Sequence, residues 1–141
     1  MTRQQRIVML IAALVAAIGL ADSGYLTVKH LRGDYVRCDT DCSAVLGSKY
    51  AEVAGVPLAE IGAVAYLAVL VTAVLAAIGL RGARSIVVLM AIPMALTSFW
   101  LVCLQAFVIH AFCKYCLLSA AACITLAVLV LTEWLIRCRV R

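Results

Sequence analysis

The sequence predicts an all-α integral membrane protein in which four transmembrane helices form a bundle. Hydrophobic residues make up 67% of the 141 residues, and the mean hydropathy is +1.13. Apolar residues are nearer half of an ordinary soluble protein. They also gather in long blocks without charge, and roughly 20 helical residues span a bilayer core about 30 Å thick. The blocks cover residues 7–21, 61–80, 85–112 and 115–132.

The connections between these blocks are short, apart from one outer loop over about residues 29–57. Short connections make consecutive helices antiparallel neighbours. Residues 1–141 are therefore expected to form a single membrane domain. The first block is too long for a typical signal peptide and lacks a cleavage motif, so we expect a retained helix. The expected helices cover about residues 7–28, 58–80, 85–110 and 113–136.

Basic residues gather at one set of helix ends, and these ends carry no acidic residue outside the spans. By the positive-inside rule we expect both termini in the cytoplasm and the long loop outside. This topology accounts for the net charge of +5, and we expect no nucleic-acid partner. The residues are Arg3, Arg6, Arg81, Arg84, Arg137, Arg139 and Arg141.

The outer loop contains a segment with apolar residues at helical spacing. It runs from Cys42 to Ala51, and Gly55-Val56-Pro57 follows as a stop. This pattern predicts a short amphipathic helix that lies over the mouth of the bundle.

The seven cysteines fall into two groups. Cys38 and Cys42 lie in the outer loop, and Cys113 and Cys116 lie at the outer end of the last helix. All four face the same side by the expected topology, and an oxidising compartment makes them candidates for disulfides. Free cysteine often packs like a small hydrophobic residue. We assign that role to Cys103, Cys123 and Cys138.

The Cys113-Lys114-Tyr115-Cys116 segment has the spacing of a redox-active dithiol. Cys113 is expected near the start of a helix, where unpaired amides and the helix dipole favour a thiolate. Cys116 lies one turn deeper on the same face. The alternatives are structural disulfides and a zinc site, since four thiols bind zinc. Apart from His110, no histidine lies near either cysteine pair. We therefore expect no metal.

Asp22 and Glu60 lie inside the expected spans, where charge is costly and often functional. Asp22 lies about one turn before the end of the first helix, and Glu60 lies near the start of the second. We regard both as candidates for a pocket or for proton transfer.

Several segments together resemble the vitamin K epoxide reductase family, in particular its bacterial members. They are residues 38–62, CDTDCSAVLGSKYAEVAGVPLAEIG, and residues 112–119, FCKYCLLS. Ser48 falls six residues after the second loop cysteine, as in the family pattern, and Tyr25-Leu26-Thr27 with His30 resembles the end of the family's first helix. The resemblance extends over nearly the whole chain.

The resemblance implies a four-helix bundle around a quinone site and a relay of thiol–disulfide exchange. A thioredoxin-like periplasmic or extracellular oxidase would reduce the loop pair, Cys38 and Cys42. Cys42 would exchange with Cys113, and Cys116 would face the quinone, which is menaquinone or ubiquinone. Ser48 would hold the loop or polarise the surroundings of the ring. The protein would lie in a bacterial inner membrane and support disulfide formation in exported proteins.

The chain also departs from the family pattern. Three residues separate Cys38 from Cys42, which is a tight spacing. Vertebrate members hold the quinone carbonyls with an asparagine and a tyrosine, and Leu58 and Ala120 stand at these positions here. This favours reduction of a quinone over reduction of an epoxide. We expect substrate contacts from Ser48, Glu60 and Ala120, and a separate partner because no thioredoxin-like domain is fused to the chain.

Two rival functions remain. Another quinone reductase architecture also has four helices and two outer cysteine pairs, but its C-x-x-C lies in the first outer loop. The order in this chain argues against it. The second rival is a membrane carrier that passes a soft metal ion between cysteine pairs, since thiolates select such ions.

Overall fold

The computed structural model describes residues 2–33 and 40–140. Four helical segments in this part of the chain are long and apolar enough to cross a membrane. The all-α membrane bundle predicted from the sequence is confirmed, and the chain is a multi-pass membrane protein. The segments are α1 (Arg3–Leu31), α3 (Leu58–Ala77), α4 (Ala83–Leu104) with the π-helical turn η1 (Gln105–Ile109), and α5 (Lys114–Val140).

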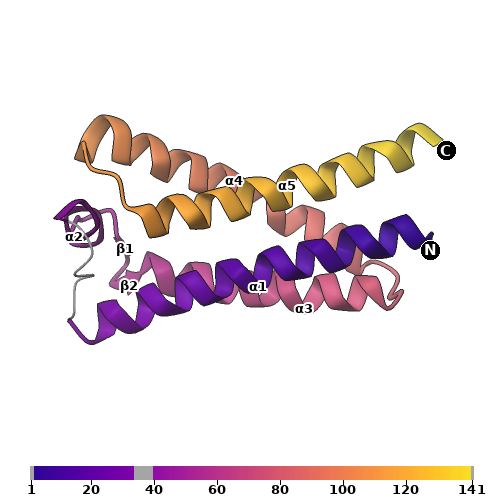
Figure 1. The fold of residues 1–141 in the computed structure, drawn as a ribbon, viewed down its shortest axis with the longest axis horizontal. Coiled ribbons are helices and arrows are strands. Elements are labelled where there is room, and N and C mark those ends of the chain that lie inside the picture. Colours follow the sequence, from indigo (N-terminus) through magenta and orange to yellow (C-terminus); the bar gives the residue numbers. More distant parts are fainter. Residues whose placement is uncertain (1, 34–39, 141) are drawn as a thin grey trace.

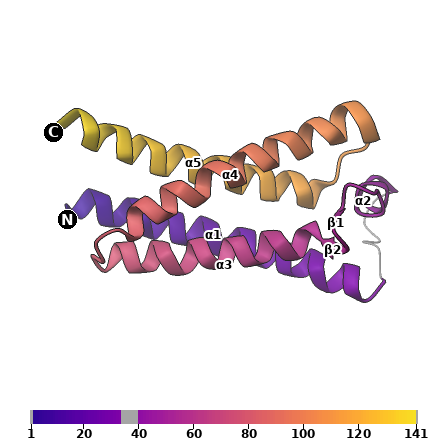
Figure 2. The same cartoon turned by 180° about the vertical axis from the view of Figure 1, so that it is seen from behind.

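The remaining elements lie together at one end of the bundle (Figures 1 and 2). They are the short helix α2 (Thr40–Leu46) and an antiparallel pair of two-residue strands, β1 (Glu52–Val53) and β2 (Val56–Pro57). The connection between α4 and α5 lies at the same end, which we call the cysteine end. Both termini and the turn between α3 and α4 lie at the opposite end, which we call the terminal end.

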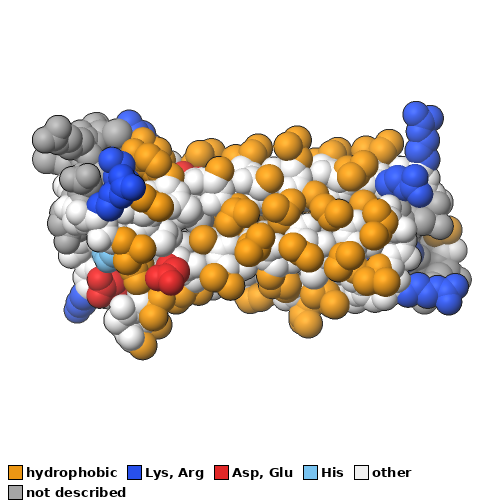
Figure 3. Space-filling view, turned by 90° about the horizontal axis from the view of Figure 1, so that it is seen from below, with side chains coloured by type: hydrophobic (Ala, Val, Ile, Leu, Met, Phe, Trp, Pro, Cys, Tyr) orange, Lys and Arg blue, Asp and Glu red, His pale blue; other side chains and the backbone are white. Residues whose placement is uncertain are grey.

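The helices pack through small side chains. Ala12 and Ala16 of α1 and Ala73 and Ala76 of α3 are fully buried in one core that runs through the bundle. Small residues let the backbones of membrane helices approach closely. Large apolar side chains point outward instead and form a broad band between charged ends (Figure 3). This distribution suits a protein surrounded by lipid.

Several helix boundaries differ from the expected ones for local reasons. α1 begins early because the Thr2 hydroxyl accepts the Gln5 backbone N–H while the Gln5 side chain accepts that of Thr2, a capping box. α3 ends at Ala77 because Gly79, with φ of 99°, turns the chain. The loop helix is shorter than predicted and is followed by the strand pair, which the sequence did not predict.

Candidate functional site

Three cysteines from two separate parts of the chain meet at the cysteine end. Cys42 of α2 and Cys113, which directly precedes α5, are both fully buried, and Cys116 of α5 is partly buried. The Cys113 sulfur makes hydrogen bonds with the thiols of both Cys42 and Cys116. Leu26 of α1 packs against this group. Cys38 lies outside the described residues.

Cys113 occupies the N-cap position of α5, near the helix start where the sequence predicted it. Its carbonyl accepts the Leu117 N–H at 2.9 Å, and its sulfur accepts the backbone N–H groups of Tyr115 and Cys116. The Cys42 sulfur accepts the N–H groups of Lys114 and Tyr115. The unpaired amides of one helix start therefore hold both sulfurs.

These contacts separate the acidities of the two thiols. The hydrogen bond from the Cys116 thiol, together with the amides of the helix start, lowers the pKa of Cys113 to about 6. Burial, followed by the hydrogen bond to Cys113, raises the pKa of Cys42 to about 11. At neutral pH Cys113 is consequently a thiolate, which is the nucleophilic form of cysteine, and Cys42 remains a protonated donor.

A π-helical turn and a buried glutamine place Cys113 at this position. The Gln105 side-chain oxygen accepts the Cys113 backbone N–H at 3.0 Å, and its backbone carbonyl accepts the Ala111 N–H at 3.2 Å. His110 follows η1 with φ of 55°, in the left-handed region. The chain thus turns sharply between the third span and α5.

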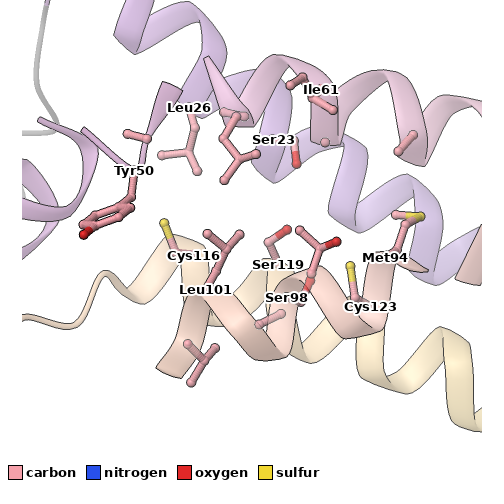
Figure 4. Close-up of a pocket in the computed structure, with 18 of the residues that line it drawn as sticks. Ser23, Leu26, Tyr50, Ile61, Met94, Ser98, Leu101, Cys116, Ser119 and Cys123 are labelled. Atoms are coloured by element: carbon pink, nitrogen blue, oxygen red, sulfur yellow. The ribbon is translucent and has the colours of Figure 1, made fainter. Parts of the chain in front are cut away.

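An apolar cavity of about 430 Å³ lies between the helices next to the three cysteines. This volume lies within the range of small-molecule sites. Cys116, Ser119 and Cys123 of α5 line one side, and Ser23 and Leu26 of α1 line the opposite side (Figure 4). Residues of α3, α4 and the loop after α2 complete the wall. Cys116 thus contacts Cys113 and also borders the cavity.

The model of the vitamin K epoxide reductase family matches residues 10–131. The chain belongs to the vitamin K epoxide reductase family. No curated protein matches this chain closely enough to count as a relative. The matched range includes the Cys42–Cys113–Cys116 group and the greater part of every spanning helix. Because the family is one of oxidoreductases, this vitamin K epoxide reductase family member is a membrane oxidoreductase.

Two of the three expected substrate contacts line the cavity of this vitamin K epoxide reductase family member. Ser48 lines it, and the Ser48 hydroxyl donates to the Val45 carbonyl at 2.7 Å, which holds the loop to the end of α2. Ala120 also lines it and is 6% exposed. Leu58, the other departure from the family pattern, lines it as well. Glu60 is exposed and is not among the lining residues.

The sequence did not predict the polar group that Tyr66, Ser119 and Cys123 form at the cavity. Tyr66 of α3 is 1% exposed and lines the cavity, and its hydroxyl donates to the Ser119 carbonyl at 2.7 Å. The same oxygen lies 2.9 Å from the Cys123 sulfur. A signal for α5 was present, since Cys116, Ser119 and Cys123 recur at three- and four-residue spacing on one helix face. No such pattern marks Tyr66.

The assignment of the three remaining cysteines to packing holds only in part. Cys123 is 4% exposed and belongs to the bundle core, although it also borders the cavity. Cys103 is partly buried. The assignment is wrong for Cys138, which is exposed near the end of α5, where the helix extends beyond its neighbours (Figure 1).

Two contacts tie the rim of the site together. His30 of α1, which lines the cavity, lies 3.1 Å from the Glu52 carboxylate of β1 and so joins the strand pair to the bundle. The rings of Tyr25 and Tyr115 pack with centroids 5.5 Å apart and join α1 to the start of α5 beside Cys113.

Proposed function

We propose that this protein is a thiol:quinone oxidoreductase that reoxidises a thioredoxin-like partner and reduces a quinone. One observation carries the proposal: the Cys113 sulfur contacts both Cys42, on the loop side, and Cys116, on the cavity side. Electrons can therefore pass from the loop to the cavity by exchange between neighbouring sulfurs.

The reduced partner first gives two electrons to a Cys38–Cys42 disulfide. Cys42 then attacks the sulfur of Cys113 in a Cys113–Cys116 disulfide, which forms a Cys42–Cys113 bond and releases Cys116. Cys38 attacks Cys42 and expels Cys113 as a thiolate. A thiol of low pKa is a good leaving group, and the pKa of Cys113 of about 6 suits this step. The Cys113–Cys116 dithiol then reduces the quinone.

The cavity supports a quinone as the electron acceptor. Its walls are mainly apolar, and Cys116 borders it. We propose that menaquinone or ubiquinone binds there, with Ser48 and Ala120 close to the ring. Glu60 is exposed and is not among the residues that line the cavity. A contact between Glu60 and the quinone stays a prediction.

The distribution of basic residues between the two ends of the bundle supports one orientation in the membrane. Arginines gather at the terminal end, for example Arg81, Arg84 and Arg137, which favours this end as the cytoplasmic one. The cysteines then face the outside of a bacterial inner membrane, where an exported oxidase of the thioredoxin type can reach the loop. The proposed result is disulfide formation in exported proteins.

The test is quinone reduction by the purified protein with a reduced dithiol protein as donor. Cys116→Ala should abolish the reaction, because it removes the cavity-side thiol. Cys138→Ala is the matched control, since this cysteine is exposed at the far end of α5, and it should retain wild-type activity. Full activity of Cys116→Ala would refute the proposal. Stoichiometric thiol-bound metal without disulfides among Cys38, Cys42, Cys113 and Cys116 would support the metal carrier instead.

A further inference from the structure

One oxygen of a buried carboxylate in α1 lacks a hydrogen-bond partner in the described part of the chain. Asp22 is 8% exposed, and its Oδ2 atom has no hydrogen bond to any residue that the structure describes. The buried Glu133 differs, because it pairs with Arg137. A charged group inside a membrane is costly unless it is paired. Asp22 therefore carries a free-energy cost that bundle packing alone does not explain.

Asp22 lies beside the dithiol and next to the cavity. Leu26, one turn further along the same buried face of α1, belongs to the same buried cluster as Cys113. Ser23, its neighbour in sequence, lines the cavity. Among the described residues, the titratable groups that interact electrostatically with Asp22 are Cys113, Cys116 and Tyr66.

The charges of Asp22 and Cys113 oppose each other. Asp22 and Cys113 interact electrostatically, and two negative charges repel strongly in a medium of low dielectric constant, so one of the two groups holds a proton. The amides of the α5 start and the Cys116 thiol stabilise the thiolate of Cys113, whereas Oδ2 of Asp22 has no such donor in the described part of the chain. The proton therefore belongs on Asp22 while Cys113 is a thiolate.

Quinone reduction needs more protons than the Cys113–Cys116 pair can supply, so the proton on Asp22 can serve the reaction. A quinone takes up two electrons and two protons, but a pair made of one thiolate and one thiol carries only one proton. One further proton must reach the cavity when the disulfide forms. Formation of the disulfide also removes the negative charge of Cys113, so the repulsion that kept Asp22 protonated disappears at that moment.

We propose that Asp22 stores the second proton of quinone reduction and releases it when the Cys113–Cys116 disulfide forms. The balanced step joins the Cys113 thiolate, the Cys116 thiol, the Asp22 carboxylic acid and the quinone. Its products are the Cys113–Cys116 disulfide, the Asp22 carboxylate and the quinol. The S–S bond forms, the two electrons pass to the quinone, and its two oxygens receive one proton from Cys116 and one from Asp22. This inference rests on the proposed function.

Infrared difference spectroscopy tests the proton directly and needs no quinone. The spectrum of the dithiol form minus that of the Cys113–Cys116 disulfide form should contain the C=O stretch of a protonated carboxylic acid. The band should disappear in Asp22→Asn and shift in Asp22→Glu. If the wild-type spectrum lacks the band, or if Asp22→Asn retains it, the inference is overturned. The wild-type spectrum and Asp22→Glu decide the question even if Asp22→Asn does not fold.

Kinetics test the use of the proton. Asp22→Asn should lower quinone reduction roughly 10²-fold, the scale of a lost proton donor, while exchange between the dithiol donor and the protein disulfide continues. Its residual rate should fall as pH rises, because solvent must supply the second proton. Asp22→Glu should restore most of the rate. Thr132→Val, which removes an exposed polar group of α5 outside the cavity lining, is the control and should keep the wild-type rate.

The two proposals fail in different ways. If the wild type does not reduce quinone, or if Cys116→Ala does, the proposed function is wrong. If Cys116→Ala is inactive but Asp22→Asn retains the wild-type rate and pH profile, only the role of Asp22 is wrong.

Discussion

The side chain of Gln105 accepts the backbone N–H of Cys113 across the turn between the third span and α5, at 3.0 Å. Gln105 is 3% exposed, so this hydrogen bond lies in the interior of the bundle. The N–H is one of the groups at the start of α5 that the helix itself cannot satisfy. Gln105 thereby fixes the residue whose sulfur joins the loop to the cavity.

Gln105→Met should destabilise the protein by about 1–3 kcal/mol, because it keeps the size of the side chain but leaves a buried N–H without an acceptor. Thermal unfolding in detergent measures the loss. Gln4→Met makes the same change at an exposed glutamine near the N-terminus and should have little effect. Equal stabilities of the two variants would show that the Gln105 hydrogen bond contributes nothing.

The rate at which Cys113 is alkylated should be proportional to the fraction of Cys113 that is a thiolate. Because the pKa is lowered to about 6, the rate should be small in acid, rise through a midpoint near pH 6 and level off above it. Cys42, with its pKa raised to about 11, should react only in strong base. Mass spectrometry of labelled peptides from the reduced protein distinguishes the two sites.

Cys116→Ala should move the Cys113 midpoint upward, because the thiol of Cys116 is the largest contributor to the lowered pKa. The same alkylation series measures the shift. Cys138→Ala should leave the midpoint where it is, since this residue lies at the other end of α5. A midpoint that stays near pH 6 in Cys116→Ala would mean that the helix amides and the Cys42 thiol set the acidity without Cys116.

Gly19→Ala should destabilise the bundle by about 1–3 kcal/mol, the usual cost of overpacking. A Cβ atom at Gly19 would overlap the buried ring of Tyr66, so α1 and α3 would have to separate. Gly24→Ala is the matched control in the same helix, because no described atom beyond the adjoining backbone lies within 4 Å of its Cβ position. There the higher helix propensity of alanine should stabilise by up to about 1 kcal/mol. Unfolding in mixed detergent compares them.

Ala120→Leu should raise the KM for quinone roughly tenfold or more, because the larger side chain fills part of the cavity next to Cys116. Exchange with the dithiol donor should continue unchanged. Ala121→Leu, at the next residue but on the exposed side of α5, should leave KM unaltered. If both variants have the wild-type KM, the quinone binds elsewhere.

The sequence predicted the fold class well because hydrophobicity and length decide it. Uninterrupted apolar blocks identified the four spans, and the short connections implied antiparallel neighbours. Boundaries were less predictable, since they depend on local hydrogen bonds such as the capping box at Thr2. The π-helical turn at Gln105 and the strand pair around Gly55 carry no strong pattern in a single sequence. Both depend on local pairing, of Gln105 with Ala111 in one case and of Val53 with Val56 in the other.

The sequence by itself determined which residue types are available for the chemistry. It supplied the Cys113-x-x-Cys116 spacing, the loop cysteine Cys42, and a carboxylate within an expected span at Asp22. Spacing along a helix also placed Cys116 one turn deeper than Cys113. These features depend on composition and on the geometry of one helix, so they can be read without a structure.

Only the tertiary structure decided which of these groups meet. It brought the Cys42 sulfur to the amides at the start of α5. It also left Oδ2 of Asp22 without a hydrogen bond to any of the described residues. It also placed Tyr66 in the lining of the cavity, where the ring packs against Gly19 of α1. Such relationships arise from the packing of α1, α3 and α5 against one another. Neither hydrophobic periodicity nor motif spacing predicts that packing.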